Sequence, residues 1–318
     1  MDYTVMHPAA PRPTRAHALS LLWFPFFFVA AMSVLYLFTF GHPQPHGVRL
    51  GILSAAPAHL PAGLVTERVA NPAGVAANHL AGAFDSATNT MYVSSAASGT
   101  RANFLAAVLH PAHIVDLVPK SSGDASGVGI FFYALPLLLV GMITSIVLLQ
   151  LAMWPLRNKA ATLAATGAFA SAVTFAVAAG RDVVPADGWL LLYGFLLTQA
   201  IGWLTTGIAR LVKQYFMPVA MTFVLILGIP TAGATVNADM MPTPLRWLHD
   251  VLPFGQFIEL ARASAYFDGR DIARPLTVLL LWVAAGAALL VWTHRPGRPA
   301  AVPAPQAAPA RRQVQGAV

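Results

Sequence analysis

Long apolar runs separated by short polar segments dominate the pattern along this chain. Six of these runs reach the roughly 20 residues that a membrane-spanning helix needs. None of the six contains Asp, Glu, Lys or Arg. They cover residues 17–40, 128–151, 160–180, 188–209, 214–233 and 275–293. The pattern predicts an all-α polytopic membrane protein with six transmembrane helices.

Residues 41–127, between the first two predicted spans, are the one sizeable water-facing region. Here the pattern changes to short strand-like pieces bounded by turn residues. Strands are predicted within 48–55, 63–71, 81–85 and 90–96, with a turn around Ser86–Asn89 and a helix from about Thr100. We expect a small α+β extracytoplasmic domain, large enough for one modest core.

The stretch 234–274, between the fifth and sixth predicted spans, is too polar to span and too aromatic for an ordinary loop. It follows a break in the fifth apolar run at Gly228, Pro230 and Gly233. An apolar stripe with helical spacing is formed by Phe254, Phe257, Ile258, Ala261 and Ala265. Gln256, Glu259, Arg262 and Ser264 lie mostly off this stripe. The pattern predicts a helical hairpin that is re-entrant or interfacial.

Charge placement predicts the orientation of the spans. Only 10% of the 318 residues are charged, against about 25% in soluble domains. With the N-terminal segment 1–16 and the disordered tail 295–318 both cytoplasmic, the inner pieces hold ten of the nineteen Lys and Arg residues and one of the twelve acids. This asymmetry obeys the positive-inside rule. The net charge of +7 therefore indicates topology, and the scattered cations do not indicate a nucleic-acid partner.

A spanning helix that ends in a G-x-P-T-x-G turn is followed here by a Pro-rich hairpin and then a helix closing on Tyr-Phe-Asp-Gly. This order resembles the membrane subunit of ABC-2-type exporters, and more narrowly the phage-infection-protein-like (Pip-like) subgroup. The residues that carry the resemblance are Gly228, Pro230, Gly233, Pro242, Trp247, Pro253, Glu259, Arg262 and Phe267. The region 41–127 is also similar, at Pro119, Gly123, Asp124 and Gly127.

The resemblance implies a multi-pass permease in the cytoplasmic membrane of a bacterium. It would work as a homodimer or heterodimer with a separate ATP-binding cassette ATPase, and 234–274 would cap the translocation path. The outer gate would then comprise Gly228, Pro230, Gly233, Pro242, Trp247, Pro253, Glu259 and Arg262. Loops that couple to the ATPase would carry Trp154, Arg157, Lys159, Arg210 and Lys213. The alternative for these loops is plain anchoring of the topology.

Catalytic chemistry is not evident in the sequence. The phosphate-binding loop G-x-x-x-x-G-K-[ST] is absent, because none of the three lysines follows a glycine. There is no cysteine. His110 with His113, and His42 with His46, lack a nearby carboxylate cluster and make poor metal sites. Ser98 and Ser121 lack the motifs of a nucleophile. We expect no enzymatic activity, cofactor or metal.

Several alternatives stay open on the sequence alone. Glu259 and Arg262 either brace the outer gate or form an exposed helical ion pair. For Gln199, Thr205 and Thr206, hydrogen bonding between helices is favoured over a substrate role. The chain as a whole is either an exporter permease for a hydrophobic or amphipathic substrate, or a non-transporting envelope protein that serves as receptor, scaffold or interaction module.

Overall fold

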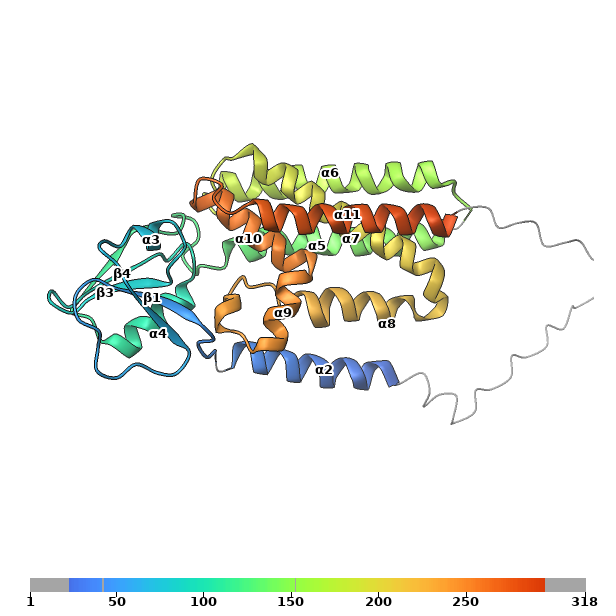
Figure 1. Ribbon diagram of the computed structural model, residues 1–318. Helices are drawn as coiled ribbons and strands as arrows, with labels where there is room; N and C mark the ends of the chain where they lie inside the picture. The colour runs from blue at the N-terminus through green and yellow to red at the C-terminus, as the bar shows by residue number, and fades with distance from the viewer. Residues whose placement is uncertain (1–22, 42, 152, 295–318) are drawn as a thin grey trace, which may run out of the picture.

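The computed structural model describes residues 23–41, 43–151 and 153–294 (Figure 1). The predictions for residues 1–16, for the first residues of the span 17–40 and for the tail 295–318 lie outside this part of the chain. Two parts of the fold are visible in Figure 1. A helical bundle lies beside a sheet domain, which contains strands β1 to β5 and helices α3 and α4.

The sheet domain contains a five-stranded mixed sheet with the order β2-β1-β3-β4-β5. Its strands are β1 (Val48–Ile52), β2 (Leu64–Arg68), β3 (Gly82–Asp85), β4 (Thr90–Val93) and β5 (His113–Asp116). Only the β3–β4 pair is antiparallel. Helix α3 (Ala73–Ala76) precedes β3, and α4 (Gly99–Leu109) connects β4 to β5. The four predicted strands are present, whereas β5 and α3 were not predicted.

The turn between β3 and β4 is organised by one carboxylate. Asp85 accepts hydrogen bonds from the hydroxyls of Ser54 at 2.7 Å and Thr88 at 2.8 Å, and from the amide of Ala87 at 3.1 Å. These bonds, led by the one from Ser54, hold the pKa of Asp85 below its usual value. The predicted turn around Ser86–Asn89 is thus fixed by its own side chains.

The core of the sheet domain is shared with the segment that precedes the hairpin helices. Strand residues such as Leu50 and Met91 are fully buried, together with Leu105 of α4. The same apolar cluster includes Val236, Met240, Met241 and Leu245 from the far end of the chain. Because the sheet buries its face against residues 236–245, the sheet domain and this segment share one packed core.

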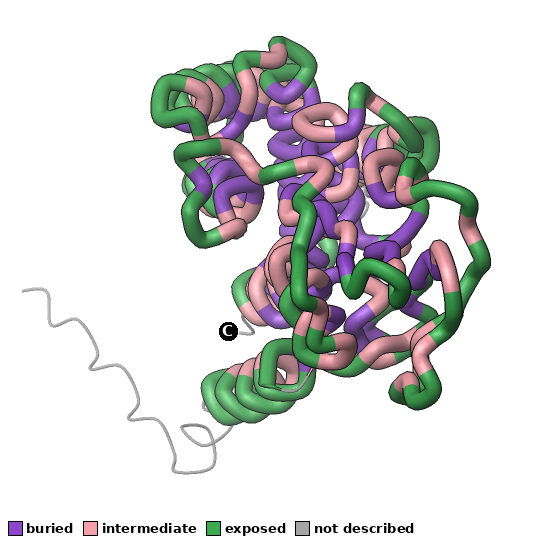
Figure 2. Tube along the Cα trace, turned by 90° about the vertical axis from the view of Figure 1, so that its left-hand side faces the viewer, coloured by how far each residue is buried: buried purple, intermediate pink, exposed green. Residues whose placement is uncertain are grey.

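Five helical segments in the described residues are long and apolar enough to cross a membrane. They are α2 (Trp23–Phe40), α5 (Gly129–Gln150), α6 (Leu156–Gly180), the stretch Gly188–Gly228, and α11 (Ala273–His294). The chain is therefore a helical membrane protein. In Figure 2 the buried positions gather in the interior of the bundle, and its periphery is exposed.

The spans predicted at 188–209 and 214–233 fall in one stretch of helical residues, Gly188–Gly228, which is 41 residues long. It comprises α7 (Gly188–Val212), the 3-10 turn η1 (Lys213–Tyr215), α8 (Phe216–Met221) and the π-helix η2 (Thr222–Gly228). Lys213 has a positive φ of 48°. Figure 1 shows the chain turning here and α8 running back toward the sheet domain.

Polar side chains and small residues hold the bundle helices together. Ser145 of α5 bonds to the hydroxyls of Thr205 at 2.7 Å and Thr206 at 2.8 Å on α7. Gln199 of α7 donates to the carbonyl of Leu163 on α6 at 3.1 Å. The expectation of hydrogen bonding between helices is therefore met at Gln199, Thr205 and Thr206.

The predicted hairpin consists of the 3-10 turn η3 (Ala238–Met240), α9 (Thr243–Val251) and α10 (Pro253–Tyr266). Helix α10 packs into the bundle, with Phe254 against Phe131 and Phe257 against Tyr133 at ring separations of 6.3 and 6.0 Å. The predicted apolar stripe is buried at Phe254, Phe257, Ile258 and Ala261, and Ala265 is partly buried.

Candidate functional site: a buried turn and the polar cavity beside it

The turn that follows η2 is buried, although it is irregular backbone. Gly228, Pro230, Thr231, Ala232 and Gly233 are all inaccessible to solvent. Such backbone has carbonyl groups that no helix or sheet satisfies, so other groups must bind them. The hydroxyl of Thr231 closes the end of η2 by donating to the carbonyl of Leu227 at 2.6 Å.

Two side chains of the hairpin bind carbonyls of this turn that no helix or sheet satisfies. Arg262 of α10 donates to the carbonyls of Gly233 at 3.1 Å and Ala234 at 3.4 Å. Nδ1 of His249 on α9 lies 2.9 Å from the carbonyl of Thr231. Since a carbonyl only accepts, this nitrogen carries the proton. The turn is therefore held by side chains from both hairpin helices.

Two further side chains of the hairpin, Gln256 and Glu259, join Arg262 and His249 into one polar network. Gln256 donates to the carbonyl of His249 at 2.9 Å, across the junction of α9 and α10. Glu259 accepts from Arg262 at 2.9 Å and lies 3.7 Å from Nε2 of His249. The Arg262 side chain is 5% exposed and that of Glu259 is 30% exposed. The pair thus braces the turn from inside the protein and is not an exposed helical ion pair.

Two glycines allow His249 to approach the turn this closely. Gly233 has a positive φ of 74°, and a Cβ there would lie 2.6 Å from Cε1 of His249. A Cβ on Gly255 would lie 2.7 Å from Nδ1 of the same ring. At Gly228 the nearest neighbour of a Cβ is the carbonyl oxygen of Phe223 at 3.3 Å. Gly233 and Gly255 are therefore required by sterics, and Gly228 much less so.

The structure brings most of the predicted gate residues together. Gly228, Pro230 and Gly233 form the turn, and Glu259 and Arg262 form the network that binds it. Pro242 precedes α9 and Pro253 begins α10. Trp247 is 65% exposed on α9 and takes no part in the network.

The sequence prediction omits two members of the network, Gln256 and His249. It includes Arg262 but places both Arg262 and Gln256 off the buried face of α10, whereas they are 4% and 3% exposed because they bind carbonyls inside the protein. His249 was not singled out. Its position four residues after buried Leu245 on amphipathic α9 is the signal that could have located it.

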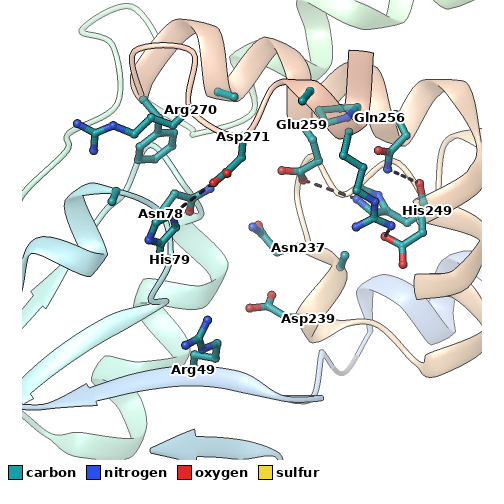
Figure 3. A pocket seen from close by; sticks show the side chains of 18 of the residues that line it. Arg49, Asn78, His79, Asn237, Asp239, His249, Gln256, Glu259, Arg270 and Asp271 are labelled. Atoms are coloured by element: carbon teal, nitrogen blue, oxygen red, sulfur yellow. Dashed lines mark hydrogen bonds and ion pairs between the residues drawn. The ribbon is translucent and has the colours of Figure 1, made fainter. Parts of the chain in front are cut away.

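A polar cavity of about 730 Å³ opens beside the turn, between the sheet domain and residues 237–275 (Figure 3). Arg49, Asn78, His79 and Arg101 contribute from the sheet domain. Its other wall carries, among others, Asn237, Asp239, His249, Gln256, Glu259 and Asp271. Figure 3 shows Asn237, Asp239 and Glu259 facing the space between the two walls. The cavity therefore borders the network that holds the turn.

Direct hydrogen bonds join the two walls of the cavity. Arg101 on α4 donates to Asp239 at 3.2 Å. Thr100 donates to the carbonyl of Thr235 at 2.7 Å. Asn237 donates to the carbonyl of Ala97 at 3.4 Å. The sheet domain is thus attached to the residues that leave the buried turn.

The predicted coupling residues lie at the end of the bundle opposite the sheet domain (Figure 1). Trp154, Arg157, Arg210 and Lys213 are exposed there, whereas Lys159 is 4% exposed within α6. The described residues of this end carry cations and no acid between 151 and 160 or between 208 and 218. The arrangement gives a basic surface at one end of the bundle.

Comparison of the chain with protein-family models, with curated proteins and with solved structures finds no match.

Proposed function

We propose that this chain is the membrane-spanning permease subunit of an ABC-2-type exporter in the cytoplasmic membrane of a bacterium. A separate ATP-binding cassette ATPase would supply the energy, and the permease would act as a dimer. The buried turn at residues 228–234 is the observation that carries this proposal. Irregular backbone at the end of a spanning helix is tolerated where protein surrounds it or where it lines a pathway.

The proposed topology has six crossings with both termini cytoplasmic. A straight helix of 41 residues would extend about 60 Å, twice the roughly 30 Å thickness of a bilayer core. The reversal at Lys213 supports dividing Gly188–Gly228 into two crossings. The basic end of the bundle supports a cytoplasmic position for residues 151–160 and 210–213, and hence an outer position for the sheet domain.

In the proposed mechanism, closure of the ATPase pushes on the basic end of the bundle. The displacement passes along α8 and η2 to the turn, whose carbonyls bind side chains of α9 and α10. Release of Arg262 and His249 from the turn carbonyls would let the hairpin swing outward. The apolar runs 128–151, 160–180, 188–209, 214–233 and 275–293 contain no Asp, Glu, Lys or Arg, which favours a hydrophobic or amphipathic substrate.

Co-purification tests the partner. The tagged protein, extracted from its native membrane in mild detergent, is expected to retain an ATPase whose hydrolysis vanadate inhibits. Reversal of Arg157 and Arg210 to Glu should release the ATPase. Both side chains are exposed, so the fold is expected to survive. Reversal of exposed Arg68 on β2 is the matched control. No ATPase, even after cross-linking, would exclude the permease.

Paired glycine substitutions test the gate. Gly233→Ala should abolish export while the protein stays in the membrane, because the new methyl group meets His249 and the positive φ opposes any Cβ. Gly228→Ala introduces a single contact at 3.3 Å and should leave most export intact. Equal export by both variants would contradict the gate assignment.

A second candidate is a non-transporting receptor, scaffold or interaction module. It is favoured by the polar cavity, which is lined by the sheet domain and lies outside the apolar bundle. The co-purification experiment separates the two functions, because a receptor requires no ATPase.

A further inference from the structure

The polar cavity has the size of a ligand site, and the proposed transport mechanism assigns it no ligand. Its volume of about 730 Å³ lies within the range of roughly 300–1,000 Å³ found for small-molecule sites. The two walls come from segments far apart in the sequence, joined by Arg101 and Asp239. Phe267 is the largest apolar side chain in the lining, so an apolar ligand would find little to contact.

The charges of the cavity nearly cancel. Five arginines and four acidic residues line it. Arg101 pairs with Asp239 at 3.2 Å, and Arg274 with Asp250 at 3.0 Å. Glu259 is paired with Arg262 behind the wall. Arg49 pairs with Glu67 at 2.6 Å, and Asp271 lies 3.4 Å from His79. A ligand with a large net charge would gain little from such a lining, because most of its charges already have an opposite partner.

Metal coordination is not the chemistry of this lining. Across the described residues, no three His, Asp or Glu side chains approach closely enough to hold an ion. What the lining offers is a mixture of planar donors and acceptors, from guanidinium, carboxylate and amide groups. Paired charges of this kind still donate and accept hydrogen bonds with their remaining atoms.

Three buried polar atoms at one side of the cavity have no hydrogen-bond partner. They are Oδ1 of Asn237, Oδ1 of Asp239 and Nε of Arg101. Asn237 is 7% exposed and Arg101 is 8% exposed. Two acceptors and one donor thus occur together where an unpaired polar atom is costly. These atoms are covered in the conformation shown, so the side chains would turn toward the cavity to meet a ligand. Adjacent hydroxyl groups would then match the set, because each hydroxyl both donates and accepts.

We propose that this cavity binds a neutral polyhydroxylated ligand, with the chemistry of a mono- to trisaccharide. Ligand hydroxyls would bond to Asn237, Asp239 and Glu259 on one wall and to Asn78 and Arg101 on the other. A bound ligand would thus bridge the two walls, which Arg101 and Asp239 already join. The site does not depend on transport and would serve an exporter or a receptor equally.

Binding is tested on the full chain in lipid nanodiscs prepared without sugar-based detergents, since a maltoside headgroup would compete. Titration calorimetry uses a panel of uncharged gluco-, manno-, galacto- and N-acetylglucosamine saccharides of one to three units at millimolar concentration. Spermidine, inorganic phosphate and dialanine are the charged comparators. We expect saturable binding of at least one saccharide and of no comparator.

Two isosteric variants assign the site. Asp239→Asn and Glu259→Gln should each weaken saccharide binding by about tenfold, the effect of one lost hydrogen bond to a ligand. Asp116→Asn, on the exposed strand β5, should bind as the wild type does. Glu259→Gln leaves the contacts of the sheet domain intact, because Glu259 pairs with Arg262 and not with the sheet domain. It therefore tests the site even if Asp239→Asn fails to fold. The proposal would be overturned if only a comparator bound, or if no compound bound. It would also be overturned if all variants bound the saccharide with equal affinity. ATPase co-purification is unaffected by any of these outcomes.

Discussion

Arg262 is the side chain on which the buried turn depends most. Replacing it by Met keeps the volume of the side chain and removes its hydrogen bonds. The bonds to Glu259 at 2.9 Å and to Gly233 at 3.1 Å have full strength, whereas the bond to Ala234 at 3.4 Å is long. We expect the turn to open far more often in this variant.

The size of the effect follows from these contacts. A hydrogen bond to a charged group contributes about 1.5–3 kcal/mol, and partial exposure of Glu259 places its bond at the lower end. The bond to Glu259 stays within α10 when the turn opens, so the bond to Gly233 sets the change: about 2 kcal/mol, which is roughly a 30-fold change in the opening equilibrium. Arg274→Met removes an ion pair of similar length, but Arg274 is 67% exposed. That control should cost at most about 1 kcal/mol.

Hydrogen exchange on peptides covering 229–236 measures this opening directly. The purified chain in nanodiscs should show protection of this segment that falls roughly 30-fold in Arg262→Met and little in Arg274→Met. Unchanged peptides from α5 would show that the bundle is intact. Equal loss of protection in both variants would refute the idea that burial makes Arg262 the principal restraint.

Three further predictions concern other parts of the fold. Ser145→Ala should lower the free energy of unfolding by about 1 kcal/mol, measured by steric trapping, whereas Thr162→Ala, whose hydroxyl bonds only within its own helix, should change it little. Asp85→Asn should lower the thermal midpoint of unfolding at neutral pH. Because the folded-state pKa of Asp85 is depressed, the stabilisation that its carboxylate gives is present above the unfolded-state pKa. The difference in thermal midpoint between wild type and variant should therefore vanish as the pH falls through the folded-state pKa, which lies below about 4. Tyr36→Phe removes the hydrogen bond from α2 to the carbonyl of Leu225, which contributes about 1 kcal/mol. The variant should therefore show less disulfide cross-linking between cysteines introduced in α2 and η2, and the chain has no native cysteine that would interfere.

The helices could be predicted because their burial requires only local apolar runs. The boundaries were less exact where polar residues continue a helix. Helix α6 begins at Leu156 rather than 160, since Pro155 precedes its first turn and the cations that follow are compatible with helix. Strand β5 has four exposed residues, so no alternation marked it. What decides such elements is pairing with a neighbour, which a single sequence does not display.

The candidate site was only partly predictable for the same reason. Spacing on one helix gave the Glu259–Arg262 pair, because three residues separate its members. The bonds that define the cavity join residues 138 and 135 positions apart, in Arg101–Asp239 and Thr100–Thr235. No local pattern specifies such contacts. The role of Arg262 likewise depends on carbonyls 28 and 29 residues earlier.

The π-helix η2 sets the rotational phase of everything that follows it. A π-helical turn is an α-helical turn that accommodates additional backbone, so deleting one residue from 222–228 would allow the segment to return to α-helix. Because the π-turn absorbs that additional residue, the deletion would leave the phase of the later residues nearly unchanged, whereas one residue added to α8 would rotate them by about 100° around the helix axis. Thr231 and Gly233 would then present their carbonyls away from His249 and Arg262. A single-residue insertion in α8 would thus undock the hairpin without altering any side chain of the network.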